Sequence, residues 1–272
     1  AALADRSAAI FGDRLDHACL VDGALLSRAA FHRYPHGDLA ALDALLARSN
    51  AGVRVIATDT VFSMDGDVAP LAVLLSLAER HDAWLVLDDA HGIGVLGGGR
   101  GSLAEFALAS PRIVCMATLG KALGGYGAFV AGDAEVIEWL MQRARTYVFS
   151  TALPPAAAAV ATAAMALIDA DPSIVRALHA RIGEFRRACE AQGVAASSAT
   201  AIQPVIVGES ARAVALSARM REAGLLVPAI RPPTVPQGTA RLRISLSAAH
   251  TRVQVETLVS ALAQALDDGA AR

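Results

Sequence analysis

Residues 84–94 read Trp84-Leu-Val-Leu-Asp-Asp-Ala-His-Gly-Ile-Gly94, an apolar run that ends in two acids and a histidine. A short apolar run of this kind is typical of a strand buried on both faces of a parallel sheet. Ligands of open α/β sheets bind beyond the carboxyl ends of the strands, where Asp88, Asp89 and His91 fall. Two acids at a buried strand end are costly unless something pairs with them. The stretch predicts an α/β fold with a polar site at this edge; the alternative is a cluster of turn and capping residues.

Apolar, β-branched runs alternate with helical patterns along the rest of the chain. This order is typical of a mostly parallel sheet covered by helices. The strands expected are 53–58, 84–88, 112–118, 127–131, 202–207, 225–230 and 241–247. The helices expected begin near Pro70, Asp133, Pro155, Pro172, Ser210 and Thr251. We predict a large α/β domain over residues 1–175 and a smaller C-terminal α+β domain over residues 176–272.

The N-terminal stretch Ala1–Phe11 reads like the tail of a helix that has nothing before it to cap or bury it. From this pattern we expect that an N-terminal portion of the protein is missing from the chain. The 272 residues present, 54% of them hydrophobic, are still enough to bury a sizeable core.

The composition argues against several classes of protein. The 24 basic and 26 acidic residues nearly balance, and aromatics make up only 4%, so neither a basic face nor stacking platforms for nucleic acid are expected. The three cysteines (19, 115 and 189) are far apart, which fits small buried thiols in a reduced, cytoplasmic protein. The most apolar stretch, residues 153–168, is mostly alanine and too short to span a bilayer. We expect it to form a buried helix, in a soluble protein without a membrane partner.

A second candidate segment is Thr118-Leu-Gly-Lys-Ala-Leu-Gly-Gly125, which places a lysine in a glycine-flanked loop directly after a predicted strand. A lysine amine can form an imine with an aldehyde, and can so tether pyridoxal 5'-phosphate (PLP). Thr118 could offer its hydroxyl to the phosphate. Taken alone, the segment more often indicates a surface loop with a solvated lysine.

The acid-terminated strand supplies what PLP chemistry needs next. A carboxylate must face the pyridine nitrogen, because the protonated ring is the electron sink, and Asp88 fits that need. His91 could reach the ring oxygen or the imine. The same stretch also matches a dinucleotide pattern, Gly92-x-Gly94-x-x-Gly97. Glycines continue this loop instead of opening a helix, and the acid that would hold a ribose is absent, so we reject a nicotinamide site.

Two further segments carry polar residues. Ser63 follows the strand predicted at 53–58, where its hydroxyl could touch a ring substituent, although a plain polar turn is about as good an interpretation. Arg241 and Arg243 alternate along a predicted strand and must point to opposite faces. The inward one would clamp a carboxylate in bidentate fashion; the alternative is an edge strand with both arginines in water.

Taken together, these segments resemble the α-oxoamine synthase family of fold-type-I PLP-dependent transferases, over essentially the whole chain. The words that carry the resemblance are Phe62-Ser-Met-Asp-Gly-Asp67, Asp88-Asp-Ala-His-Gly-Ile-Gly94, Ala229-Ile-Arg-Pro-Pro-Thr-Val-Pro236, Gly238-Thr-Ala-Arg-Leu-Arg243 and Ala248-Ala-His250. Within the family they favour a member that condenses L-alanine with pimeloyl-CoA, or with a pimeloyl-carrier protein, and releases CO2 and the thiol in biotin biosynthesis.

The resemblance implies a role for each matching residue. Lys121 would bind PLP as a Schiff base and then act as general acid and base. The other cofactor ligands implied are Asp88 at the pyridine nitrogen, His91 and Ser63 at the ring oxygen, His17 stacked on the ring, Thr118 at the phosphate, and Thr151 at a phosphate in the partner subunit of a homodimer with shared active sites. Arg243 would bind the substrate carboxylate, and Thr234 and His17 would also contact substrate.

The chain also departs from the family pattern. Asp59 stands where a glutamate is expected, which shortens the side chain by one methylene. The family's N-terminal part, with an arginine for the acyl substrate and an aromatic near the phosphate, has no match. Two alternatives stay open: a glycine-using relative, such as 2-amino-3-ketobutyrate CoA ligase or 5-aminolevulinate synthase, and a catalytically inactive paralogue.

Overall fold

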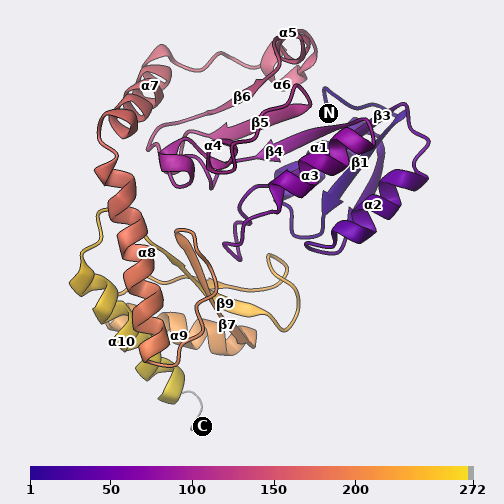
Figure 1. The fold of residues 1–272 in the computed structure, drawn as a ribbon. Helices are drawn as coiled ribbons and strands as arrows, with labels where there is room; N and C mark the ends of the chain where they lie inside the picture. The colour runs from indigo at the N-terminus through magenta and orange to yellow at the C-terminus, as the bar shows by residue number, and fades with distance from the viewer. Residues whose placement is uncertain (269–272) are drawn as a thin grey trace. The chain divides into compact units, whose positions relative to one another are not determined.

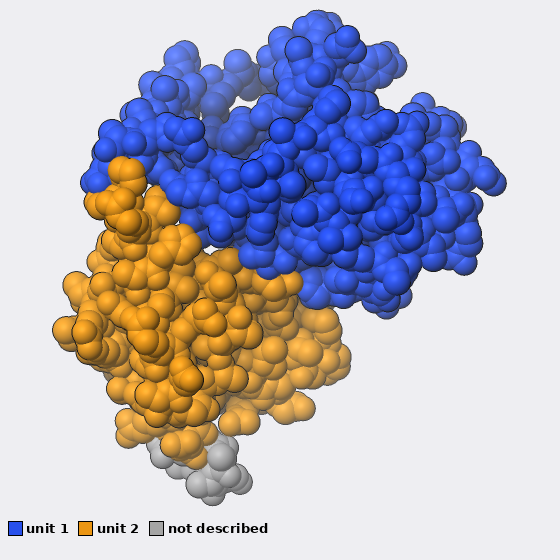
Figure 2. All heavy atoms as spheres, viewed as in Figure 1, with its two compact units in different colours: residues 1–62, 68–171 blue, residues 63–67, 172–272 orange. Residues whose placement is uncertain are grey.

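The computed structural model describes residues 1–268, and the chain divides into two compact units. The first unit comprises residues 1–62 and 68–171, and the second comprises residues 63–67 together with the chain from Pro172 onward (Figure 2). The chain therefore leaves the first unit after Phe62, contributes five residues to the second, and returns at Val68. The sequence pattern gave no sign of this excursion, and the expected boundary at 175/176 lies inside a helix.

The first unit is built on a six-stranded sheet of order β2-β1-β3-β4-β5-β6 (Figure 1). The strands are β1 (Ala8–Asp13), β2 (Ala30–Tyr34), β3 (Val53–Asp59), β4 (Ala83–Asp88), β5 (Ile113–Thr118) and β6 (Ala128–Gly132). The first five run parallel, and only β6 is antiparallel to its neighbour β5. The predicted α/β class and mostly parallel sheet are confirmed.

Alternate residues of the central strands feed two separate apolar clusters. In β4, Leu85 and Leu87 belong to a large cluster beneath helices α2 (Leu39–Arg48) and α3 (Leu71–Arg80). Trp84 and Val86 pack instead on the cluster of the opposite face, which includes Ala24 of α1 (Ala18–Ser27). Burial on both faces explains why this strand reads as a continuous apolar run.

The first unit is completed by η1 (Gly97–Gly99), α4 (Ser102–Glu105), α5 (Ala134–Arg143), α6 (Arg145–Val148) and α7 (Pro155–Ala170). The predicted N-cap of α5 is confirmed, since the Asp133 carboxylate accepts from Glu135 N at 3.0 Å. The glycine-rich word 92–99 ends in a single 3-10 turn, followed only by the four-residue α4, which agrees with our rejection of a dinucleotide site.

Two expectations about the first unit are wrong. Residues 1–11 are not the tail of a helix, because β1 begins at Ala8 and pairs with β2 and β3 on its two sides. Pairing and burial in the middle of the sheet outweigh the helix propensity of its alanines. The alanine-rich helix α7 is not buried: within it only Ala161 and Ile168 are inaccessible. Its alanines cover little area, so the helix forms by propensity and remains largely exposed.

The second unit is an α+β structure, as predicted. It contains an antiparallel sheet of order β7-β9-β8 and three helices, of which α9 packs on the sheet and α10 packs on α8 and α9 (Figure 1). Its elements are α8 (Ser173–Ala191), β7 (Ile202–Gly208), α9 (Ser210–Glu222), β8 (Ala229–Ile230), β9 (Ala240–Ser245) and α10 (Arg252–Asp268). Within residues 1–268 no single helix is both long and apolar enough to cross a membrane; α7 and α8 pass that test only as a bent pair, on length and composition.

Candidate active site

The two acids at the end of β4 have different surroundings. Asp89 is fully engaged in holding local structure: it accepts from the Thr60 hydroxyl at 2.5 Å, from Ser102 N at 3.0 Å and from the Ser102 hydroxyl. Asp88 accepts one backbone bond, from Ala90 N at 3.0 Å on Oδ1, and its Oδ2 lies 3.6 Å from the Cys19 thiol. Asp89 thus builds the turn into α4, and Asp88 is the acid that a ligand at the strand end would meet.

His17 stands at the N-terminus of α1, next to the ends of β3 and β4. Its backbone N–H donates to Asp59 Oδ2 at 2.7 Å, and its ring Nδ1 accepts from Cys19 N at 3.2 Å, which makes it the N-cap of the helix. Asp59 is the last residue of β3 and the register neighbour of Asp88 on β4. The structure therefore brings His17 and Asp88 to the same edge of the sheet.

A chain of buried carboxyl groups continues from Asp59 into the protein. Asp59 N donates to Asp16 Oδ1 at 3.2 Å, and both side chains are buried. Burial, reinforced by the charge of Asp59, raises the pKa of Asp16 to about 8. Burial also raises the pKa of Asp59 to about 7, against the opposing effect of the His17 N–H bond. The charge of Asp88 raises the pKa of Asp59 further, and the charge of Lys121 lowers it. The pKa of Asp59 therefore depends on both residues.

The lysine loop lies between β5 and β6 and is folded tightly on itself. Leu119 N donates to Gly127 O at 2.8 Å, and Gly124 N donates to Lys121 O at 3.0 Å. Gly124 has φ of 61°, a left-handed conformation that glycine adopts at little cost. A Cβ on Gly94 would lie 2.5 Å from Ala122 Cβ, so the absence of a side chain at Gly94 allows the lysine loop to approach this closely.

Lys121 has a further distinction that the motif analysis missed. It is the only lysine among the 272 residues, and the other 23 basic residues are all arginine. An arginine guanidinium does not form the imine that an amine forms with an aldehyde. A count of lysines alone could have singled out this position.

Thr118, the last residue of β5, carries a polar atom that lacks a partner. Its Oγ1 is buried and makes no hydrogen bond within the protein. A buried hydroxyl without a partner costs free energy, and such groups often mark a ligand site. This orphaned hydroxyl lies at a strand end three residues before Lys121, where a phosphate was predicted.

Four further residues predicted for the site are His91, Thr151, Thr234 and Ser63. His91 is half-buried in the turn after β4, and Thr151 is exposed in the segment that joins α6 to α7. Thr234 is exposed in a turn of the second unit, in which its N–H donates to Arg231 O at 3.0 Å. Ser63 belongs to the five-residue excursion and is also part of the second unit.

The two arginines of β9, Arg241 and Arg243, bind different partners within the second unit. Arg241 is the buried one: its Nη1 pairs with the Asp65 carboxylate and also donates to Met64 O at 3.2 Å. Arg243, on the other face, donates through Nε to Ser63 O at 2.6 Å and through Nη1 to the Ser245 hydroxyl at 2.9 Å. Partial burial lowers the pKa of Arg243. Both arginines therefore hold the excursion 63–67 against β9.

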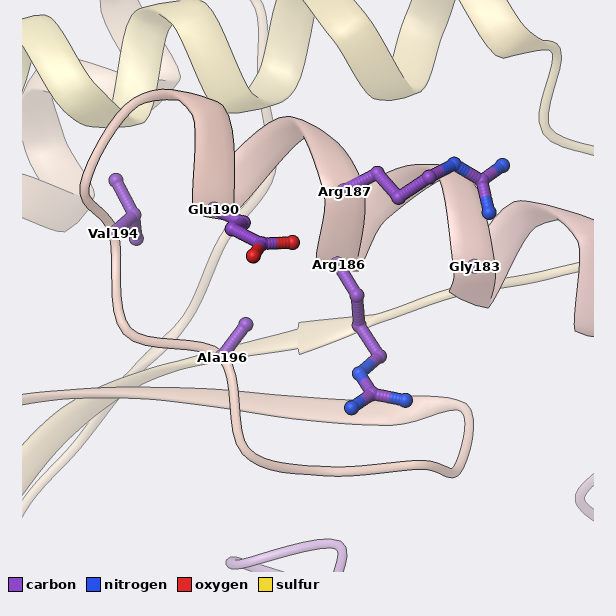
Figure 3. Close-up of a pocket in the computed structure, with 6 residues that line it drawn as sticks. All are labelled: Gly183, Arg186, Arg187, Glu190, Val194 and Ala196. Atoms are coloured by element: carbon purple, nitrogen blue, oxygen red, sulfur yellow. The ribbon is translucent and has the colours of Figure 1, made fainter.

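Two cavities of similar volume have no predicted site residue in their lining. One, of about 490 Å³, is lined by α8 and the loop after it, and Figure 3 shows the side chains of Arg186 and Arg187 pointing apart around it, so they do not converge on one anion. The other, of about 480 Å³ in the first unit, is almost wholly apolar and is lined in part by Leu119 and Leu123, on either side of Lys121. Within residues 1–268 no group of three or more His, Cys, Asp and Glu could hold a metal ion.

Comparison with known proteins connects this geometry to a family. Residues 1–262 match the family model described as aminotransferase class I and II. An 8-amino-7-oxononanoate synthase of Aromatoleum aromaticum is 58% identical over 96% of this chain and 68% of its own length, and one of Methylobacillus flagellatus is 56% identical over 96% and 66%. The chain thus spans about two thirds of the length of the curated relatives it matches.

Solved structures agree with this result. A serine palmitoyltransferase of Sphingomonas wittichii has a TM-score of 0.93 at 30% identity, covering 99% of this chain and 69% of that one. An 8-amino-7-oxononanoate synthase of Francisella tularensis has a TM-score of 0.85 at 28% identity, covering 98% and 78%. The chain belongs to the aminotransferase class I and II family, whose fold is that of the fold-type-I PLP-dependent transferases. Within it, the chain is a member of the 8-amino-7-oxononanoate synthases.

Proposed function

We propose that the protein catalyses the PLP-dependent condensation of L-alanine with a pimeloyl thioester. The products are 8-amino-7-oxononanoate, CO2 and the free thiol, which makes the reaction a step of biotin biosynthesis. The observation that carries the proposal is the meeting of three groups at one sheet edge: Asp88 at the end of β4, Thr118 at the end of β5, and the loop of the sole lysine. The named relatives identify the reaction that such a site performs.

The residues present suit the cofactor. The orphaned Thr118 hydroxyl offers a donor to the phosphate, and Asp88 offers a buried carboxylate to the ring nitrogen. Lys121 supplies the amine, and the tight loop around it has room for backbone to approach a ligand because it is rich in glycine. Bound PLP supplies an electron sink for the pair of electrons left when the α-proton or the carboxylate of the substrate departs.

The side chains of this chain then have separate tasks. Lys121 removes the proton from the α-carbon of alanine and later returns one. With PLP bound, His17 would lie against its ring, and His91 and Ser63 would bind the ring oxygen. Arg243 and Thr234 would bind the amino acid, and the guanidinium of Arg243 suits its carboxylate. The alanyl carbon attacks the thioester carbonyl, the thiol leaves, and CO2 is lost from the resulting β-keto acid.

The glycine-using alternative is not favoured, because the curated relatives described above all carry the name of the alanine-using synthase. We also propose a cytoplasmic location, in keeping with three cysteines that form no disulfide.

We further propose a homodimer in which Thr151 reaches a phosphate of the partner subunit. Large apolar side chains are exposed along residues 126–149 of the first unit, which is the chain just before Thr151. They are Tyr126, Phe129, Val130, Trp139, Met141, Tyr147, Val148 and Phe149. Exposed apolar surface of this extent is typical of an interface.

The sole lysine gives the proposal a sharp test. Incubation with PLP followed by borohydride reduction should attach one pyridoxyl group to Lys121, and peptide mass spectrometry locates it. Lys121→Ala should lose both the visible absorbance of bound PLP and turnover, whereas Lys121→Arg keeps the charge and should lose them equally. Product formation from pimeloyl-CoA with alanine, compared with glycine, then tests the substrate. Reduction that labels no lysine while turnover persists would reject the proposal.

A further inference from the structure

Asp59 binds the backbone of His17, and Cys19 binds its ring. Neither residue has a role in the proposed function. We propose that Asp59 and Cys19 are positioning residues, which fix the His17 ring relative to Asp88 so that both side chains meet one cofactor ring. We call Asp59, His17, Cys19 and Asp88 the His17 clamp. The inference rests on the proposed function, because it concerns the residues that would contact PLP.

Asp59 fixes the backbone half of the clamp. Its Oδ2 accepts the His17 N–H at 2.7 Å, and its own N–H is tied to Asp16 at 3.2 Å. Because Asp59 ends β3 and lies beside Asp88 in register, this bond ties the first residue before α1 to the two central strands. The His17 backbone therefore cannot shift along the sheet edge without breaking a bond to a buried carboxyl group.

Cys19 fixes the ring half. Its backbone N–H donates to His17 Nδ1 at 3.2 Å, so Nδ1 is an acceptor in this contact. The Cys19 sulfur lies 3.0 Å from the same nitrogen and 3.6 Å from Asp88 Oδ2. The thiol proton thus has two acceptors, one on the histidine and one on the acid. Neither contact with the ring involves Nε2.

The clamp works only with a neutral thiol. Partial burial of the thiol, together with the charges of Asp88 and Asp59, raises the pKa of Cys19 to about 11, and a bond from Leu20 N–H only partly opposes this. At neutral pH the thiol is therefore a donor, and a thiolate, which would repel Asp88, is not formed. A thiol is a weak donor, so it orients Asp88 Oδ2 while leaving that oxygen basic enough to accept from the protonated ring of PLP.

The first test needs no cofactor, because it reads the thiol itself. Of the three cysteines, only Cys19 is exposed, so iodoacetamide at pH 8 reports on it alone. Asp88→Asn and Asp59→Asn each remove a charge that holds the thiol protonated, and each should speed alkylation by about tenfold per unit by which the thiol pKa falls. Asp22→Asn, an exposed acid on the same helix, is the matched control and should leave the rate unchanged. Equal rates in all four proteins would overturn the clamp.

The second test adds PLP. Cofactor over His17 and Asp88 should slow alkylation of Cys19 at least fivefold in the wild type. If PLP develops its visible absorbance and the rate does not change, the clamp does not face the cofactor and the inference fails. If no absorbance develops, the proposed function is rejected for this chain, and the first test still decides the positions of Cys19, Asp59 and Asp88.

The third test separates positioning from stability. Cys19→Val keeps the volume but removes the donor, and should shift the pH midpoint of the bound-PLP absorbance and lower kcat more than it raises KM for alanine. Cys19→Ser restores a donor and should recover most of both. Asp38→Ala removes the N-cap of α2, which accepts from Ala41 N at 2.9 Å, and serves as a purely structural control. An unshifted midpoint in Cys19→Val, or the same shift in Asp38→Ala, would contradict the assignment.

Discussion

The orphaned hydroxyl of Thr118 shows how a single residue can report a ligand that the protein is built to receive. Folding buries this group without a partner, at a cost of about 1–3 kcal/mol. The sequence predicts a phosphate at Thr118, three residues before Lys121, and in the structure the hydroxyl has no hydrogen-bond partner within the protein.

The same residue yields a two-sided prediction. Thr118→Val keeps the shape and removes the unpaired hydroxyl, so the free energy of unfolding of the PLP-free protein should rise by about 1 kcal/mol. The affinity for PLP should fall roughly tenfold or more, because a bond to a charged phosphate is lost. Urea unfolding without PLP and titration with PLP measure the two effects. A variant that is less stable and binds PLP as well as the wild type would contradict both.

Asp16 and Asp59 predict a pH dependence of stability. Their pKa values, raised to about 8 and about 7, lie above the ordinary 3.8 of the unfolded chain. Between those values the unfolded chain has released protons that the folded chain retains, so stability is fully present at low pH and is lost as the pH rises toward 8.

The Asp16→Asn variant lacks the carboxyl group that contributes most to this loss of stability at high pH. Relative to the wild type, its free energy of unfolding should increase between pH 5 and pH 8 by roughly 2–4 kcal/mol, an order of magnitude that allows for sharing of charge between the two acids. Urea unfolding at both pH values measures the difference, with Asp22→Asn as the exposed control. Parallel pH curves for Asp16→Asn and wild type would show that Asp16 is not buried in its acid form.

At the scale of elements, the sequence predicted the strands whose residues are apolar in an unbroken run. β3, β4 and β5 fall within a residue or two of the expected ranges, because burial on both faces dictates their composition. β1 was missed, since Ala8-Ala-Ile-Phe-Gly-Asp13 is rich in alanine and glycine and becomes a strand only between two partners. β2, with its exposed residues, carries no apolar pattern at all.

The candidate site, like the strands, was predictable only in part. Lys121, Asp88 and Thr118 were predictable, because each stands in a local word at the end of a recognisable strand. The bond from His17 to Asp59 joins residues 42 apart, and the pair Arg241–Asp65 joins residues 176 apart. No local pattern indicates such partners, since only the order of the strands brings them together.

Arg241 of β9 binds the excursion 63–67, so we expect its replacement to lower the free energy of unfolding strongly. Arg241→Met leaves the Asp65 carboxylate without its buried partner and frees Met64 O, so the free energy of unfolding should fall by about 3 kcal/mol. Arg252→Met breaks the exposed pair with Glu256 and should lower the free energy of unfolding far less than Arg241→Met does. Chemical unfolding of both variants makes the comparison, and equal losses would show that burial of the Arg241 pair contributes nothing.

On the scale of the whole molecule, the exposed apolar segment 126–149 predicts self-association. Phe149 and Tyr147 are among its most exposed members, with 72% and 64% of their surfaces accessible. Replacing both with aspartate puts charge into the proposed interface, and the dimer should dissociate at micromolar concentration, as sedimentation velocity would record. The pair Leu25 and Leu26, equally exposed on α1 but outside this segment, is the matched control. An unchanged sedimentation coefficient in the Phe149 and Tyr147 variant would place the interface elsewhere.

The five-residue excursion also constrains the order in which the protein can be completed during synthesis. Asp65 leaves the ribosome long before Arg241 has been translated, yet the two must meet inside the same folded unit. The second unit therefore cannot close one residue at a time behind the ribosome, and it cannot be excised as a continuous piece from Pro172 onward without losing the partner of its buried arginine. A folding chain must keep residues 63–67 accessible until its last strand arrives, so nascent chains arrested before Ala240 should remain open to proteolysis at this loop.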